Sequence, residues 1–168
     1  MPKTRKLALM AMFTAASLIV FVIESQIPAP IPVPGVKLGL ANVVTLIAMV
    51  MLGRREAGLI LLVRIAMGSM FTGGVSAFIF SIAGGTLAYA VMCLTLGPFS
   101  KKLLWVVSVF GAAAHNLGQL AAAVLITKTS ALFVYAPVLL ASAVVTGLFT
   151  GFAATYLVGR LDKRLKEC

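Results

Sequence analysis

Long apolar runs, separated by short groups of charged residues, prolines and glycines, make up most of the chain. Most of them approach the roughly 20 residues that an α-helix needs to cross a bilayer, but the second and third are only about 15 residues long. Those two can span untilted or where the bilayer thins, or one of them can be re-entrant. The pattern predicts six membrane-spanning helices, at about residues 7–24, 38–53, 57–71, 75–96, 103–127 and 132–159.

The basic residues are distributed unevenly between the two ends of these runs. Eleven of the 14 Lys and Arg residues lie in the N-terminus, the second and fourth connections, and the C-terminal tail. Only Lys37 and Lys128 lie in the other connections, and Arg64 lies inside a run. The positive-inside rule therefore predicts that both termini are cytoplasmic. The first run is long for a signal-peptide core and no small-x-small cleavage site follows, so we expect a retained helix.

The composition agrees with this pattern. Of 168 residues, 61% are hydrophobic and 11% are charged, whereas a soluble domain has about a quarter of its residues charged. We therefore expect an all-α integral membrane protein, a single domain over residues 1–168, in the cell membrane. The net charge of +10 would suggest nucleic acid in a soluble protein, but its placement at the ends of runs indicates membrane orientation instead. Cys93 and Cys168 are isolated, so neither a disulfide nor a metal site is expected.

The connection between the first two runs, from Ser25 to Val36, carries prolines alternating with apolar residues. This spacing favours a stiff, extended segment over a helix. Such a segment can be a lid across a cavity or a plain connector. The prolines are Pro28, Pro30, Pro32 and Pro34.

Polar residues inside the early runs or at their outer ends are candidates for a binding site, because such residues are costly within a bilayer. Arg64 lies near the middle of the third run, where an arginine costs about 2.5–3.5 kcal/mol on insertion scales. Its expected protein partner is Glu24. The pair can join two helices, or Arg64 can bind an anion in a forked geometry. Lys37 and Asn42, at the start of the second run, can extend the same cationic site, although Lys37 can also reach the headgroups.

The fifth run contains HNLGQ, at residues 115–119. Spacings of four and three residues place His115 and Gln119, and Asn116 and Gln119, next to each other on a helix. These side chains can hydrogen-bond a ligand, or they can join neighbouring helices. A metal site is not expected, because there is no other histidine and acids are few.

Small residues recur at helical spacing and predict close helix packing. The first run has Ala8, then Ala11 and Ala15 in A-x-x-x-A spacing, and the last has Gly147 and Gly151 in G-x-x-x-G spacing. These faces can pack within the chain or against a partner subunit.

Several stretches together resemble a known family: PGVKLGLANVVTL, the segment around Arg64, FTGGVSAFIFSIAGGTLA, AHNLGQ and YAPVLLASAVVTGLFTG. They are similar to a family of small bacterial membrane proteins called the Gx transporter family, or heptaprenyl diphosphate synthase component I. That family is in turn similar to the S components of energy-coupling factor (ECF) transporters. The resemblance implies an S-component-like six-helix bundle with a substrate pocket toward the outer face, to which Tyr135 would contribute. It also implies that the Ala11–Ala15 face docks on a transmembrane coupling subunit.

The synthase name does not agree with the residues. Prenyl-chain elongation uses aspartate-rich motifs that hold Mg²⁺, but Asp162 is the only aspartate. The other acids, Glu24, Glu56 and Glu167, are scattered. There is also no nucleophile–base pair and no phosphate-binding P-loop. We therefore expect no catalysis and no cofactor.

These observations favour a membrane-embedded substrate-binding subunit of an ECF-type uptake transporter, for a small anionic or amphipathic solute. The chain has no ATP-binding motif, so a coupling subunit and ATPases are expected as partners. The alternatives are a non-catalytic membrane subunit that binds an isoprenoid diphosphate or quinone, and a membrane part of a redox assembly. A secondary transporter is disfavoured by the lack of internal repeats and the scarcity of membrane acids.

Overall fold

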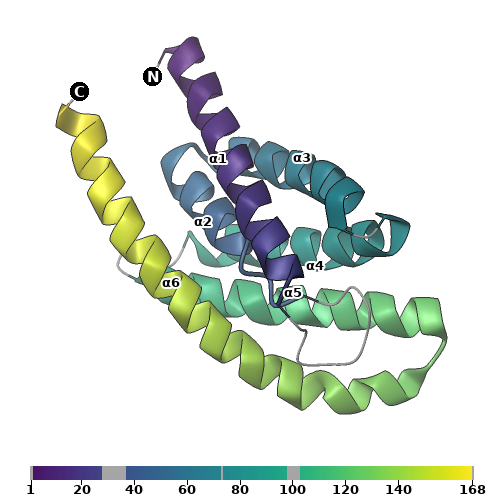
Figure 1. Cartoon of the computed structure of the whole chain (residues 1–168). Coiled ribbons are helices and arrows are strands. Elements are labelled where there is room, and N and C mark those ends of the chain that lie inside the picture. Colours follow the sequence, from purple (N-terminus) through teal and green to yellow (C-terminus); the bar gives the residue numbers. More distant parts are fainter. Residues whose placement is uncertain (1, 28–36, 73, 98–102, 168) are drawn as a thin grey trace.

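The computed structural model of the chain describes residues 2–27, 37–72, 74–97 and 103–167 (Figure 1). These residues form helices and no strands, which confirms the all-α prediction. The proposed lid prolines lie outside the described residues. The helices are α1 (Lys3–Ser25), α2 (Asn42–Met51), α3 (Arg54–Thr72), α4 (Gly74–Thr95), α5 (Leu104–Thr127), the short 3₁₀ helix η2 (Ser130–Tyr135) and α6 (Ala136–Glu167).

Four helical segments are long and apolar enough to cross a membrane, within the described part of the chain. They are α1, α4, α5 and the segment Ser130–Leu161, which joins η2 to α6. Large apolar side chains remain exposed along them, as expected for surfaces that face lipid. The prediction of a membrane protein therefore agrees with the fold.

The second predicted span, 38–53, is not a full-length helix. Its helical part, α2, has ten residues, which is about 15 Å at 1.5 Å per residue and half of a hydrocarbon core. An extended and turn segment, Lys37–Ala41, precedes it. The third predicted span corresponds to α3, which is 19 residues long but carries Arg54, Arg55, Glu56 and Arg64, and it does not qualify as an apolar span. The described residues therefore form six α-helices and one short 3₁₀ helix, while the number of spans is smaller by this criterion.

Helix α5 lies at the centre of the helix packing, with α4 on one side and α6 on the other. Helix α6 is long and curved, and both termini lie at the same end of the molecule (Figure 1). A Cβ at Gly147 would be 2.6 Å from the Val109 Cα, and one at Gly151 would be 2.4 Å from the Trp105 Cα. The G-x-x-x-G face predicted from the sequence thus packs inside the chain, against the backbone of α5.

The apolar core and the polar site lie along different parts of α1. Met10 and Phe13, in its N-terminal half, pack against a core cluster that includes Leu46, Ile60 and Met92. The buried residues near its C-terminal end are Phe21 and Glu24. This arrangement brings the end of α1 to the polar residues of α3, α4 and α5.

Candidate functional site

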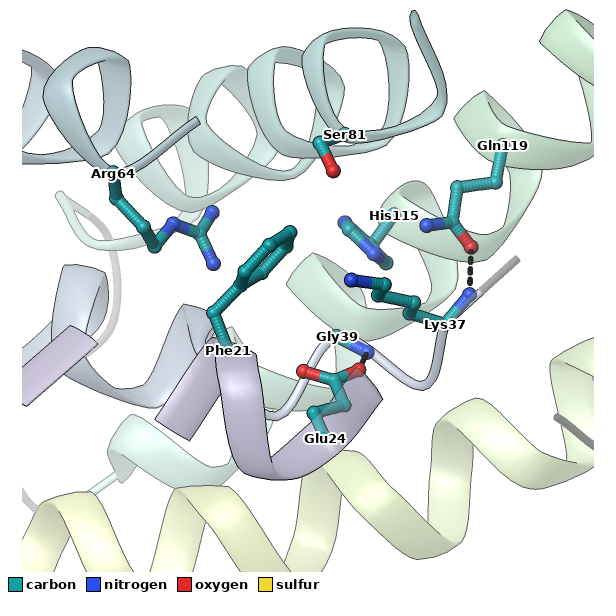
Figure 2. Close-up of a pocket in the computed structure, with 8 residues that line it drawn as sticks. All are labelled: Phe21, Glu24, Lys37, Gly39, Arg64, Ser81, His115 and Gln119. Atoms are coloured by element: carbon teal, nitrogen blue, oxygen red, sulfur yellow. Dashed lines mark hydrogen bonds between the residues drawn. The ribbon is translucent and has the colours of Figure 1, made fainter. Parts of the chain in front are cut away.

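A small cavity forms where the C-terminal end of α1, the Lys37–Ala41 segment, α3, α4 and α5 meet (Figure 2). Five of the residues predicted as site residues line it, although they come from four separate parts of the chain. The lining residues are Phe21, Glu24, Lys37, Gly39, Arg64, Ser81, His115 and Gln119.

Glu24 connects α1 to the start of α2. Its side chain is 3% exposed, and its carboxylate accepts hydrogen bonds from the backbone N–H groups of Gly39 and Ala41. The Ala41 N to Glu24 Oε2 distance is 3.3 Å. These two N–H groups belong to the turn that precedes α2, and a buried backbone N–H needs an acceptor. Glu24 therefore fixes the Lys37–Ala41 segment against α1.

Arg64 lies in the interior of the bundle, with 2% of its side chain exposed. Its Nη2 donates to Asn42 Oδ1 at 3.3 Å, and its guanidinium carbon lies 5.7 Å from the centroid of the Phe21 ring. Arg64 and Glu24 line the same cavity, but no direct ion pair joins them in the described part of the chain. The Glu24 carboxylate is bonded to backbone N–H groups instead.

Lys37 closes one side of the cavity. Its backbone N–H donates to Gln119 Oε1 at 3.0 Å, and its ammonium lies 3.6 Å from the centroid of the Phe21 ring. This is a cation–π contact. Burial lowers the pKa of Lys37, and the Glu24 carboxylate opposes that shift. Phe21 thus lies between two cations, Lys37 and Arg64.

His115 and Gln119 project from α5 into the cavity, and Ser81 projects from α4 (Figure 2). Both α5 side chains are nearly completely buried, and the His115 Nε2 has no hydrogen-bonding partner among the described residues. Close packing of α4 on α5 makes this possible, because a Cβ at Gly84 would be 2.8 Å from the Gln119 Cγ. The predicted His115–Gln119 pair is therefore on one face, and that face meets the cavity.

Three predicted residues do not line the cavity. Asn116 faces α6, where its Nδ2 donates to the Leu139 carbonyl oxygen at 2.8 Å. Its neighbour His115 points about 100° away around the helix, which is why only one of the two reaches the cavity. Tyr135 lies at the end of η2, is 37% exposed and does not line the cavity. Asn42 lies behind the residues that line the cavity: it accepts a hydrogen bond from Arg64, and its Nδ2 lies next to Gly39.

Three lining residues were not predicted: Phe21, Gly39 and Ser81. Phe21 lies one helical turn before Glu24, so the buried face of α1 carried that signal. Gly39 has φ of +80°, and a Cβ there would be 2.7 Å from the His115 Cδ2. The KLGLAN stretch therefore needs glycine at this position.

The cavity is small and rich in hydrogen-bond donors. Its free space is about 10 Å³, which suffices for one water molecule. Two cations and one carboxylate line it, so its formal charge is positive. Such an arrangement attracts an anionic group, and a larger ligand requires the Lys37–Ala41 segment or a neighbouring helix to move.

The residues of the predicted partner face lie on one side of α1. Ala8, Ala11 and Ala15 are all exposed. At the N-terminal end of the same helix, the Lys6 ammonium donates to the Glu56 carboxylate of α3.

Comparison with protein families identified a match over most of the chain. A search of curated proteins and a search of solved structures found none. The model of the family described as heptaprenyl diphosphate synthase component I matches residues 13–157. This range includes every residue that lines the cavity, from Phe21 to Gln119. The chain therefore belongs to the heptaprenyl diphosphate synthase component I family.

Proposed function

We propose that the protein is the substrate-binding subunit of an uptake transporter of the S-component type, located in the plasma membrane. The observation that carries the proposal is the convergence of Lys37, Arg64, His115 and Gln119 on one buried cavity. Residues that only join helices pair with one another, whereas His115 Nε2 and Arg64 Nε have no partner among the described residues. Such atoms are costly when left unpaired, and a ligand can satisfy them.

The excess of cations defines the chemical class of the solute. Arg64 and Lys37 both contact the Phe21 ring, and only Glu24 opposes them. The solute therefore carries a negative group and is small or amphipathic, and Ser81, His115 and Gln119 would hydrogen-bond its polar atoms. The protein itself performs no chemistry on it in this proposal.

Ligand retention tests the binding role. The protein, purified in mild detergent, is analysed by native mass spectrometry for a co-purifying small molecule. Arg64→Gln removes a buried charged donor, so we expect the retained fraction to fall about 10-fold or more. Arg55→Gln removes an exposed arginine outside the cavity and should leave retention unchanged. Equal retention in both variants contradicts the binding role of Arg64.

Transport further requires partner subunits, and the exposed Ala8–Ala11–Ala15 face of α1 is the proposed coupling surface. Ala11→Leu and Ala15→Leu should abolish uptake in cells while the purified variants keep their ligand, because a leucine keeps a small-residue interface apart. Ala16→Leu makes the same change about 100° around the helix and serves as the control. Co-purification of a coupling subunit and ATPases with the wild type supports the proposal. Loss of ligand in Ala11→Leu and Ala15→Leu argues against the assignment of this α1 face as the coupling surface.

The second candidate is a non-catalytic subunit that binds an isoprenoid diphosphate or a quinone. The description of the family favours it, as does an apolar groove of about 620 Å³ between α4 and α5 that could hold a prenyl chain. Binding of farnesyl diphosphate that is weakened both by Arg64→Gln and by Ala122→Trp, in the groove, supports this candidate. Co-purification of a prenyl synthase in place of ATPases would also favour it.

A further inference from the structure

The turn before α2 already binds a carboxylate of the chain itself, that of Glu24. The Lys37–Ala41 segment turns its backbone toward α1, and the N–H groups of Gly39 and Ala41 donate to the buried Glu24 carboxylate. These two N–H groups lie in the turn that leads into α2, whose own first N–H groups donate to the carbonyl oxygens of Gly39, Leu40 and Ala41. The turn therefore forms a site for a carboxylate next to the positive end of the helix dipole.

Other buried donors at this site are not used by Glu24. Arg64 Nε has no partner among the described residues, and neither does Asn42 Nδ2. Their orientation is fixed, because Arg64 Nη2 donates to Asn42 Oδ1 and Asn42 therefore presents its NH₂ group elsewhere. Both residues are more than nine-tenths buried, and Arg64 lines the same cavity as Glu24. The site thus has donors with which the Glu24 carboxylate, bonded to Gly39 and Ala41, does not pair.

We propose that the N–H groups of Gly39 and Ala41 and the Arg64 guanidinium form a carboxylate-binding site, which Glu24 fills when no ligand is bound and a carboxylate of the ligand fills when one is. A flat, two-oxygen group is what the two N–H groups already accept, and a ligand that takes the place of Glu24 meets the same donors. The substrate class is thus an organic carboxylate. This assignment rests on the proposed function for the existence of a ligand, but the site itself can be tested without one.

Chemical rescue tests the site directly. Glu24→Ala, purified in lipid nanodiscs, leaves the N–H groups of Gly39 and Ala41 without their acceptor, so its melting temperature should fall by several degrees. Sodium formate should restore most of that loss, and sodium chloride at the same ionic strength should not. Wild-type protein should respond equally to both salts, because Glu24 competes with formate.

Glu56, in the first turn of α3 and outside the cavity, offers a matched control. Glu56→Ala also removes a carboxylate that bonds to another helix, through Lys6, but Lys6 is 41% exposed and water can reach the groups left behind. Formate should not raise its melting temperature more than chloride does. In the double variant Glu24→Ala, Arg64→Gln, formate rescue should be lost or strongly reduced.

The proposal is overturned if formate and chloride act equally on Glu24→Ala, or if formate rescues Glu56→Ala as well. Rescue by phosphate that exceeds rescue by formate overturns the carboxylate assignment. If Glu24→Ala does not fold, the readout is the yield of folded protein from purification with formate against chloride, and equal yields overturn the proposal. A negative result in uptake or ligand retention contradicts the proposed function but leaves formate rescue unaffected, so the two failures can be told apart.

Discussion

At the scale of single residues, Gly39 shows how strongly the site constrains the backbone. It combines a φ of +80° with contact to His115 and Asn42. Side chains other than glycine are strained in this conformation, and a Cβ would also press on the imidazole. The residue that shapes the cavity is therefore one that contributes no side chain to it.

We expect Gly39→Ala to lower the free energy of unfolding by more than Gly74→Ala does. Gly74 also has a positive φ, of +66°, but nothing lies within 4 Å of its added Cβ, so it reports strain alone, about 1–2 kcal/mol. Gly39→Ala adds the contact with His115 to that cost. Thermal unfolding of both variants in the same detergent measures the difference, and equal losses would show that the contact is relieved at no cost.

Much of the site could be predicted from residue types alone, because charges and amides inside an apolar chain are conspicuous. Arg64, Lys37, Glu24, His115 and Gln119 were found in this way. The partner of Arg64 was not, because the sequence does not show that backbone N–H groups would take the Glu24 carboxylate. Phe21 and Ser81 were missed since phenylalanine and serine are common in membrane helices.

At the scale of helices, α5 and α6 depend on small residues at their contact. The Cβ of an alanine at Gly147 or Gly151 would meet backbone atoms of Val109 or Trp105, which cannot rotate away as a side chain can. These two glycines therefore determine how closely α6 approaches α5.

We expect Gly147→Ala and Gly151→Ala each to destabilise the protein by about 1–3 kcal/mol, through overpacking. Gly159→Ala lies in the same helix with nothing within 4 Å of the added Cβ, and it should stabilise by about 0.5–1 kcal/mol, because alanine favours a helix. Denaturant unfolding of the three variants checks the opposite signs. Destabilisation by all three would point to an effect of helix α6 in general.

The existence of five helices followed directly from the length of the apolar runs, and their ends agree with the structure to within several residues. The start of α2 at Asn42, several residues into the predicted run, did not, because the residues between Lys37 and Asn42 are apolar or glycine. Gly39 turns there bonded to the Glu24 carboxylate and next to His115, about 75 residues later in the chain. Such long-range contacts leave no periodic signal in the sequence.

At the scale of the whole molecule, both termini lie at one end of the bundle (Figure 1), in agreement with an even number of crossings. The basic residues predict that this end is cytoplasmic. The turn between α5 and η2, which contains Lys128 and Thr129, lies in the connection predicted to be outside.

We therefore expect Thr129→Cys to react with a membrane-impermeant maleimide on intact cells, and Thr4→Cys to react only after permeabilisation. Both positions are exposed, so accessibility depends on the membrane alone. Cys93→Ser and Cys168→Ser provide a background without other thiols. Labelling of Thr4→Cys on intact cells would reverse the orientation.

Among the described residues, α1 bonds to other elements near each of its ends: Lys6 with Glu56, and Glu24 with Gly39 and Ala41. Met10 and Phe13 pack its N-terminal half against the core, although only a small share of the helix is buried. A solute that displaces Glu24 therefore releases the C-terminal end of α1, while Lys6 and the core packing keep its N-terminal half in place. The helix would then tilt about that half and change the angle of the exposed Ala8–Ala11–Ala15 face, so that a neighbouring subunit on the far side of the bilayer senses that the cavity is full.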